Sequence, residues 1–132
     1  MSDRNPFAIP LGTAYGPLGF TLRSVTPGHA VWEYRVDKAH FNPNGVLHGG
    51  VVMSLLDTAM GFAVTSTVLE KGRYNAAAEM TTHFLAPIRE GVVTAEGKVV
   101  KVGKRLAVVD GRATDSSGTL VAIATATHAL LP

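Results

Sequence analysis

A long apolar segment in the middle of the chain constrains its fold more than any other feature. Residues 50–69 read GVVMSLLDTAMGFAVTSTVL, and Asp57 is the only charged side chain among them. A run of this length and hydropathy predicts one helix that is buried on all sides inside a soluble fold. Because an ionised carboxylate is very costly to bury without partners, a lone Asp57 on such a helix requires a reason. We interpret that reason as catalysis.

The same segment is close in length to a membrane-spanning helix, so this alternative has to be weighed. Asp57 and the several Ser, Thr and Gly residues argue against a span. The strand patterns on both sides of the run also need a helix to pack against. We therefore expect a soluble protein that has no membrane partner.

Composition limits the remaining choices. The 132 residues, 46% hydrophobic and 17% charged, suit one globular domain over 1–132 with an irregular N-terminal arm at 1–16. The absence of cysteine excludes disulfides and thiol nucleophiles, and no His, Asp and Glu set has metal-ligand spacing. A net charge of +2 is too small to indicate a nucleic-acid partner. With no signal-peptide pattern at the start, we expect a cytoplasmic protein without metal or cofactor.

Segments on both sides of the apolar run have the patterns of β-strands. Two such segments precede the run, at residues 18–25 and 30–36. Four follow it, near residues 75–86, 91–102, 105–115 and 119–130, with glycine-containing turns at 103 and 117–118. Small residues along one face of the last segment would let a sheet curl around the helix. The order predicts an α+β fold in which an antiparallel sheet wraps around one central helix.

The loop before the helix supplies the second part of a candidate site. Residues 42–50 read NPNGVLHGG, and Gly49 and Gly50 expose N–H groups at the positive end of the helix dipole. A carbonyl oxygen resting there would be polarised as in an oxyanion hole. Asp57 lies two helical turns further on, in apolar surroundings that increase the basicity of a carboxylate. These groups suffice to hydrolyse an ester or thioester rather than an amide, since no residue obviously protonates a poor leaving group.

Taken together, these motifs closely resemble one known family. Asn42-x-x-Gly45-x-x-His48-Gly49-Gly50, followed by Leu56-Asp57 in an apolar helix, resembles the hotdog-fold acyl-CoA thioesterases of the phenylacetate-pathway (PaaI) type. The segment Phe84-Leu85-Ala86-Pro87 resembles the family's Phe-Leu-x-Pro strand, and 102–105 its Gly-Lys turn. The resemblance covers about residues 18–130. It implies a hotdog fold, a curved antiparallel sheet wrapped around one long central helix.

The resemblance also implies roles for individual residues. Asp57 matches the family's acidic residue, which acts as a general base on water or as a nucleophile. Gly49 matches the residue whose backbone N–H holds the thioester oxygen, and Asn42 matches the polar residue near that carbonyl. We add His48 to the catalytic set, with the main role of pinning the loop by hydrogen bonding. We assign the acyl-CoA-binding surface to Gly50, Thr58, Ala77, Gly103, Lys104 and Arg105, of which the last three match a turn along the CoA arm.

Ala77 departs from the family pattern. Many relatives carry Ser or Thr at this position to orient the water, and here the side chain is a methyl group. Another residue must then position the water, and we expect Thr58, Thr81 or Glu79 to do so. The histidines at 83 and 128 lie on predicted strands and are interpreted as edge or interface residues.

The sequence thus predicts a metal-free acyl-CoA thioesterase that releases a free acid and CoA. The resemblance implies a homodimer or homotetramer with sites at the subunit interface, where Asp57 works with the partner subunit's Gly49. Trp32, Tyr34 and the alanine-rich strands suggest a sheet face for subunit packing. Aromatic acyl groups such as phenylacetyl or hydroxybenzoyl are expected first, and medium-chain groups second. The alternatives are a non-catalytic acyl-CoA-binding hotdog module and a hotdog enoyl-thioester hydratase.

Overall fold

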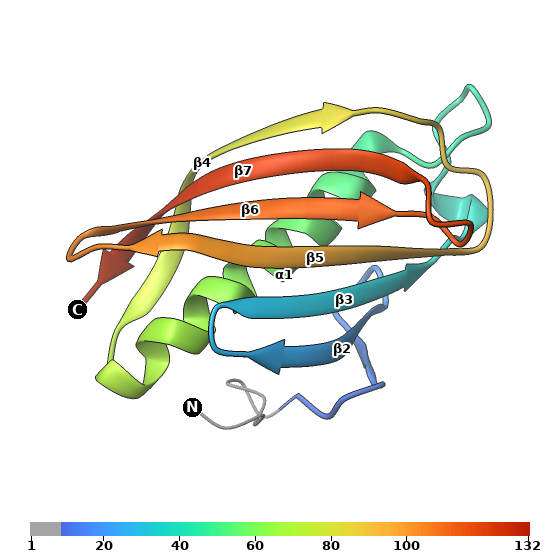
Figure 1. Cartoon of the computed structure of the whole chain (residues 1–132). Coiled ribbons are helices and arrows are strands. Elements are labelled where there is room, and N and C mark those ends of the chain that lie inside the picture. Colours follow the sequence, from blue (N-terminus) through green and yellow to red (C-terminus); the bar gives the residue numbers. More distant parts are fainter. Residues whose placement is uncertain (1–8) are drawn as a thin grey trace.

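The computed structural model describes residues 9–132, in which a curved sheet encloses a single long helix (Figure 1). Helix α1 spans Gly49–Val68 and continues into the short 3-10 helix η2, Leu69–Lys71. Before it come β1 (Ala14–Tyr15), β2 (Phe20–Thr26), β3 (His29–Arg35) and the 3-10 helix η1 (Lys38–His40). After it come β4 (Tyr74–Phe84), β5 (Val92–Val102), β6 (Leu106–Thr114) and β7 (Leu120–Leu131). The predicted hotdog architecture is confirmed.

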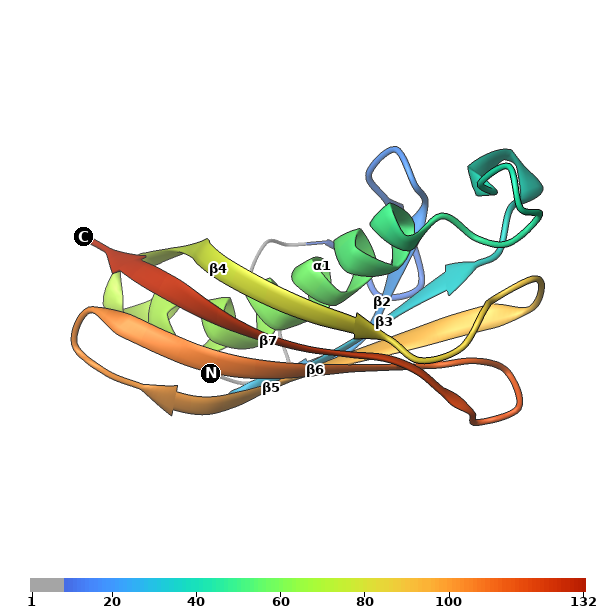
Figure 2. The same ribbon diagram turned by 90° about the horizontal axis from the view of Figure 1, so that it is seen from above.

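The sheet has seven strands in the order β1-β2-β3-β5-β6-β7-β4, and every neighbouring pair is antiparallel. Although β4 follows the helix directly, it pairs with the last strand, β7, and therefore forms one edge of the sheet. The view from above shows α1 lying along the concave side of this sheet (Figure 2). The other edge of β4 has no neighbour within residues 9–132.

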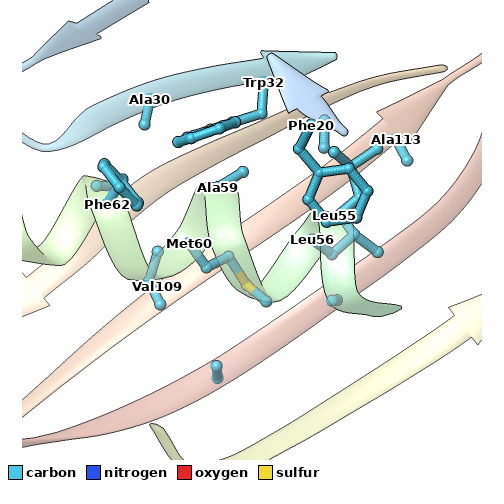
Figure 3. Close-up of a cluster of buried hydrophobic side chains, with 14 of the residues drawn as sticks. Phe20, Ala30, Trp32, Leu55, Leu56, Ala59, Met60, Phe62, Val109 and Ala113 are labelled. Atoms are coloured by element: carbon cyan, nitrogen blue, oxygen red, sulfur yellow. The ribbon is translucent and has the colours of Figure 1, made fainter. Parts of the chain in front are cut away.

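The hydrophobic core fills the space between α1 and the concave face of the sheet. Leu55, Leu56, Ala59 and Met60 point from the helix toward the strands (Figure 3). Trp32 belongs to this core, and its ring contacts Phe62 with the centroids 4.8 Å apart. Such edge-to-face pairs add to the stabilisation from buried area.

Trp32 and Tyr34 do not form a subunit-packing face, contrary to the sequence prediction. Both side chains are almost fully buried against α1 and the neighbouring strands. The Tyr34 hydroxyl lies 2.6 Å from Nδ1 of His40 and accepts a hydrogen bond from the Asp37 N–H at 3.0 Å. Tyr34 thereby attaches the loop that precedes α1 to the core, which is a structural role inside one chain.

Helix α1 is buried on its sheet side but not on all sides, so that part of the prediction is wrong. Met53, Ser54 and Asp57 are exposed and lie along one strip of the helix. Within residues 9–132, Gly49–Lys71 is the one helical segment with the length and hydropathy of a membrane span, and 67% of its most apolar window is buried inside the fold. The apolar content of α1 is thus used mainly to pack against the sheet.

The boundaries of the elements follow from local chemistry. The helical segment formed by α1 and η2 ends where Gly72 adopts the left-handed conformation, with φ 72°. Each of the six predicted strands agrees with an observed strand to within two residues at both ends. The predicted arm at 1–16 is wrong at β1, which pairs with β2, and residues 1–8 of the arm lie outside the described residues.

Two glycines allow the helix to approach the sheet closely. Gly97 on β5 and Gly111 on β6 are opposite each other in the ladder. A Cβ at position 97 would lie 2.6 Å from the carbonyl carbon of Ala59, on the helix backbone. A Cβ at position 111 would instead meet the side-chain ends of Met60 and Leu56 at 3.0 and 3.1 Å. The backbone of α1 therefore rests directly on β5.

We expect Gly97→Ala to destabilise the protein more than the matched change Gly111→Ala. The first methyl meets helix backbone, which cannot move without displacing α1, whereas the second meets flexible side chains. Overpacking of this kind costs about 1–3 kcal/mol, and Gly97→Ala should lie at or above the top of that range. Urea unfolding at one protein concentration measures both. Equal losses of unfolding free energy for the two variants would contradict the direct contact between the helix backbone and Gly97.

Candidate active site

His48 fixes the start of the helix and decides which backbone donor stays free. The His48 Nδ1 accepts a hydrogen bond from the Gly50 N–H at 2.8 Å, and the His48 backbone N–H donates to the His40 carbonyl at 3.0 Å. Such side-chain acceptance satisfies one of the unpaired N–H groups at a helix start. The Gly49 N–H, in contrast, has no hydrogen-bond partner within the part of the chain that the structure describes. Of the two adjacent glycines, Gly49 presents the free donor.

Asn42 and Gly49 line the same cavity, of about 350 Å³, which we call the Gly49 pocket. The Asn42 Oδ1 accepts from the Asn44 N–H at 2.9 Å, so its amide nitrogen faces away from this turn. The remaining walls are mostly apolar and include Phe84, Leu85 and Ile88. The pocket therefore combines polar donors with a hydrophobic lining, which is typical of small-molecule sites.

Gly50 does not share this pocket. It lines a separate hollow beside His48 and Ser54, and its N–H is already engaged. Gly50 therefore has no free backbone N–H with which to make its predicted contribution to substrate binding.

Asp57 lines a second cavity, of about 250 Å³, together with Thr58 and Ala77; we call it the Asp57 pocket. The carboxylate is exposed rather than buried, because it lies on the exposed strip of α1 that Met53, Ser54 and Asp57 form; we call this the open strip. The Thr58 hydroxyl donates to the Ser54 carbonyl at 2.8 Å, so its proton is engaged. Three of the predicted site residues are thus brought together here, but Thr58 is not free to donate to a water.

Thr81 and Glu79 are also unsuited to hold a water for Asp57. Thr81 lines a cavity with Asp110 and Arg112, which alternate with inward-facing residues of β6 and so lie on the convex face of the sheet. The Thr81 hydroxyl donates to the Glu79 carboxylate on that same side. Both side chains are therefore on the opposite face of the sheet from Asp57.

A buried polar network forms the inner wall of the Asp57 pocket. The Asn75 Nδ2 lies 3.1 Å from the Gly61 carbonyl and 3.1 Å from Nδ1 of His128, while its Oδ1 accepts from the Thr65 hydroxyl at 2.8 Å. Because a carbonyl oxygen only accepts, the Asn75 nitrogen must be the group that faces Gly61. The same NH₂ group then donates to His128 Nδ1. In the neutral ring, the proton of His128 is therefore on Nε2.

His128 lies on β7, between β6 and β4, so its interpretation as an edge histidine is wrong. It is only 2% exposed and continues the inward-facing row of Ala122, Ala124 and Ala126 on β7. Burial lowers the pKa of His128 below its ordinary 6.5, and the charge of Asp57 opposes this shift. The signal that could have revealed it is the alternation of β7, which assigns position 128 to the helix-facing side.

One chain does not bring all the predicted site residues together. The Gly49 pocket and the Asp57 pocket share no lining residue. Gly49 and Asp57 are eight positions apart on α1, which corresponds to about 12 Å along the helix axis. The carboxylate and the free N–H are therefore too far apart to act on one thioester within a single subunit.

The turn at Gly103, Lys104 and Arg105 lies still further from Gly49. It joins β5 to β6 at the end of the molecule where α1 finishes, opposite the helix start (Figure 1). The Arg73 guanidinium holds this turn by donating to the Lys104 carbonyl at 2.6 Å and to the Leu130 carbonyl at 3.0 Å. The Lys104 and Arg105 side chains are exposed. Across residues 9–132, no three His, Asp or Glu side chains gather as a metal site.

The buried neutral His128 gives the protein a pH-dependent stability. Its pKa is lower in the folded protein than the ordinary 6.5, so the unfolded chain binds the proton more readily. This contribution is therefore complete above pH 6.5 and declines as the pH falls below it. We expect His128→Gln to flatten the loss of unfolding free energy between about pH 7.5 and pH 5.5 in urea titrations. Asp57 and Tyr15 also line the pocket, so both remain in the variant, and an unchanged slope would contradict the assignment.

Comparisons with known proteins agree with this fold and these motifs. The family profile of the Thioesterase superfamily matches residues 44–122, from the loop before α1 to β7. Acyl-coenzyme A thioesterase 13 of Homo sapiens is 34% identical over 106 residues, which are 77% of this chain and 73% of that protein. The 1,4-dihydroxy-2-naphthoyl-CoA hydrolase of Listeria monocytogenes is 29% identical over 113 residues, or 86% of this chain and 91% of that one.

A solved structure shows the same relationship in three dimensions. The Escherichia coli PaaI protein, from the phenylacetic acid degradation operon, superposes with a TM-score of 0.81 and 29% sequence identity. The superposition covers 87% of this chain and 81% of that one. The chain belongs to the Thioesterase superfamily, as a hotdog-fold thioester hydrolase.

Proposed function

We propose that the protein hydrolyses an acyl-CoA to a free acid and CoA, in sites that two copies of the chain build together. The observation that carries this proposal is that the Gly49 N–H and the Asp57 carboxylate lie in two separate pockets of one chain. The Gly49 pocket holds a free N–H and an apolar lining, whereas the Asp57 pocket holds the carboxylate. Neither pocket contains both the Gly49 N–H and the Asp57 carboxylate.

The free edge of β4 supports a two-fold pairing of chains. This strand runs from Tyr74 to Phe84, and within the described residues 9–132 it pairs with β7 alone. Apolar side chains remain open along it, with Tyr74 62% exposed and Phe84 53% exposed. A long unpaired edge is a ready template for another strand, and two copies of one edge pair isologously across a two-fold axis.

The open strip of α1 gives this pairing a consistent register. Met53 is the midpoint between Gly49 and Asp57 in the chain, and it is 37% exposed. If a two-fold axis passes close to Met53, two antiparallel helices place each Gly49 beside the partner subunit's Asp57. A homodimer is then the smallest active unit. A homotetramer of two such dimers would leave these sites unchanged.

The proposed chemistry uses the groups in this arrangement. The thioester oxygen accepts a hydrogen bond from the Gly49 N–H, with the Asn42 amide close by, which stabilises the negative charge that develops there. Asp57 removes a proton from water while the water oxygen bonds to the carbonyl carbon. The C–S bond then breaks, and the CoA thiolate takes the proton from Asp57. His48 holds the helix start so that the Gly49 N–H keeps its direction.

The proposed acyl group is aromatic, such as phenylacetyl or hydroxybenzoyl, with medium-chain acyl groups as the second choice. The apolar wall of the Gly49 pocket supports a hydrophobic acyl group. One relative is named for an aromatic naphthoyl-CoA substrate, and the E. coli PaaI protein comes from the operon for phenylacetic acid degradation. In the antiparallel dimer, the end of one α1 lies beside the start of the other. Lys104 and Arg105 would then reach the CoA phosphates of the partner subunit's site.

A thiol-release assay on phenylacetyl-CoA, hydroxybenzoyl-CoA and octanoyl-CoA tests the reaction. We expect kcat of Asp57→Asn to fall about 100-fold or more, because removal of a general base costs two to four orders of magnitude. The unfolding free energy should change little, since Asp57 is exposed and the amide has the same shape. Undiminished release by Asp57→Asn would refute the proposed chemistry.

Mixing two inactive variants tests whether sites lie between chains. Gly49→Pro removes the free N–H at the first helical position, where proline is tolerated, and His48 already has the extended conformation that proline requires before it. Gly49→Ala keeps the N–H and adds a Cβ in the same place against the movable ring of Phe84, so it is the matched control. We expect Gly49→Pro to lose about 100-fold in kcat, and Gly49→Ala much less.

Co-refolding of Gly49→Pro with Asp57→Asn should restore about a quarter of the wild-type rate, since half of the random dimers are mixed and each mixed dimer has one intact site of two. If both halves came from one chain, every site would still lack one group. The mixture would then stay as inactive as the separate variants.

A further inference from the structure

We propose that His128 is a water-binding residue of this site: its neutral Nε2–H holds the water that Asp57 deprotonates, and Asn75 positions the ring. This inference rests on the proposed function and adds the group that holds the nucleophile. It is needed because Ala77 offers no hydroxyl and because the Thr58 proton is engaged.

The first support is that the Asp57 pocket contains a hydrogen-bond donor without a partner among the described residues, the Nε2–H of His128. His128 lines the Asp57 pocket and is almost completely buried, yet its Nε2 has no hydrogen-bond partner within residues 9–132. An unpaired buried donor costs about 1–3 kcal/mol. Such a cost is relieved when an acceptor arrives. A donor kept unpaired beside the proposed base is therefore expected to serve a bound molecule.

The second support is that the contact with Asn75 keeps the ring proton of His128 on Nε2. The Asn75 NH₂ group donates to Nδ1 and is itself oriented by the Gly61 carbonyl and the Thr65 hydroxyl on α1. With Nδ1 accepting, the only ring proton is on Nε2. Burial keeps the ring neutral by lowering the pKa of His128. A protonated ring would carry a hydrogen on Nδ1 that points at the Asn75 NH₂ group, so this arrangement requires the neutral form.

The third support is the position of His128 opposite Ala77. The two residues are direct partners in the β4–β7 ladder. Cβ atoms of such a pair lie about 4.5–5.5 Å apart, so an imidazole at 128 and a hydroxyl at 77 would reach the same small volume. The methyl group of Ala77 leaves that volume to the imidazole. His128 therefore stands where a hydroxyl donor on β4 would otherwise act.

The other polar groups of the pocket leave this role to His128. The Thr65 hydroxyl and the Asn75 NH₂ group are already used within the network, and Tyr15 lies on the exposed side of the pocket. A water that accepts from His128 Nε2–H and donates to Asp57 keeps one lone pair for the carbonyl carbon. As Asp57 takes the proton, the oxygen forms the new C–O bond and the C–S bond breaks.

Substitutions at 128 and 77 test this role together. His128→Leu removes the donor with similar size, and His128→Gln keeps an N–H near the position of Nε2. We expect kcat for His128→Leu to fall about 100-fold with little change in KM, and His128→Gln to keep most of the rate. Ala77→Ser added to His128→Leu should recover about tenfold, because the serine hydroxyl donates from across the ladder.

Urea unfolding of each variant separates this role from a purely structural one. A structural histidine would give rates that follow the folded fraction, with no recovery from Ala77→Ser, and that result would overturn the inference. If Asp57→Asn is inactive while His128→Leu keeps the wild-type kcat, the inference fails and the proposed function stands. If Asp57→Asn keeps its activity, the proposed function fails first.

An isotope experiment tests whether a water attacks at all. In a single turnover of the wild-type enzyme in H₂¹⁸O, direct attack of water puts ¹⁸O into the released acid. If Asp57 attacked as a nucleophile, it would displace the CoA thiolate and form an acyl–Asp57 anhydride. Opening of that anhydride by water at the Asp57 carboxyl carbon would release a first acid with the carboxylate's own ¹⁶O and put the label into Asp57. The first result is expected. The second would remove the water that His128 is proposed to hold.

Discussion

The contact between the backbone of α1 and the small residues of the sheet is the constraint on which the rest of the structure depends. Gly97 lies directly under Ala59, and alanines line the neighbouring strands on the helix side. This close approach lets the sheet curve around one helix, so that a chain of 132 residues buries an extensive core. It also leaves one strip of α1 uncovered, which is where the carboxylate lies.

Periodicity in the sequence was sufficient to predict the fold, because alternation within strands and one long apolar run have a single simple arrangement. The same reasoning failed where it had to decide which side of a helix or strand faces the core and which faces solvent or a partner subunit. Hydropathy alone does not show that a helix has an exposed strip, so α1 was expected to be buried on all sides, although the family resemblance implied that Asp57 lies at a subunit interface. Trp32 and Tyr34 were assigned to an interface because a strand's two faces look alike in sequence until the helix is placed.

The candidate site was predicted in part for a similar reason. Gly49, Asn42 and Asp57 form local motifs whose spacing is visible in the chain, and the structure places each beside a pocket. The network of Asn75 and His128 joins β4, β7 and α1, and no sequence spacing connects residues so far apart. Long-range contacts of this kind appear only after the strand order is known, since β4 pairs with the last strand rather than the next one.

The unpaired outer edge of β4 has a consequence for the period between synthesis of the chain and its proposed assembly. Within residues 9–132, the eleven-residue strand β4 is paired with β7 on one side and has no neighbour on the other, and it carries exposed apolar side chains such as Tyr74 and Phe84. If two copies pair through this edge as proposed, their encounter is second order in subunit concentration, and other extended segments compete for the same hydrogen bonds. Slow or dilute synthesis thus prolongs the interval in which misassembly is possible, even for a chain whose own fold is complete.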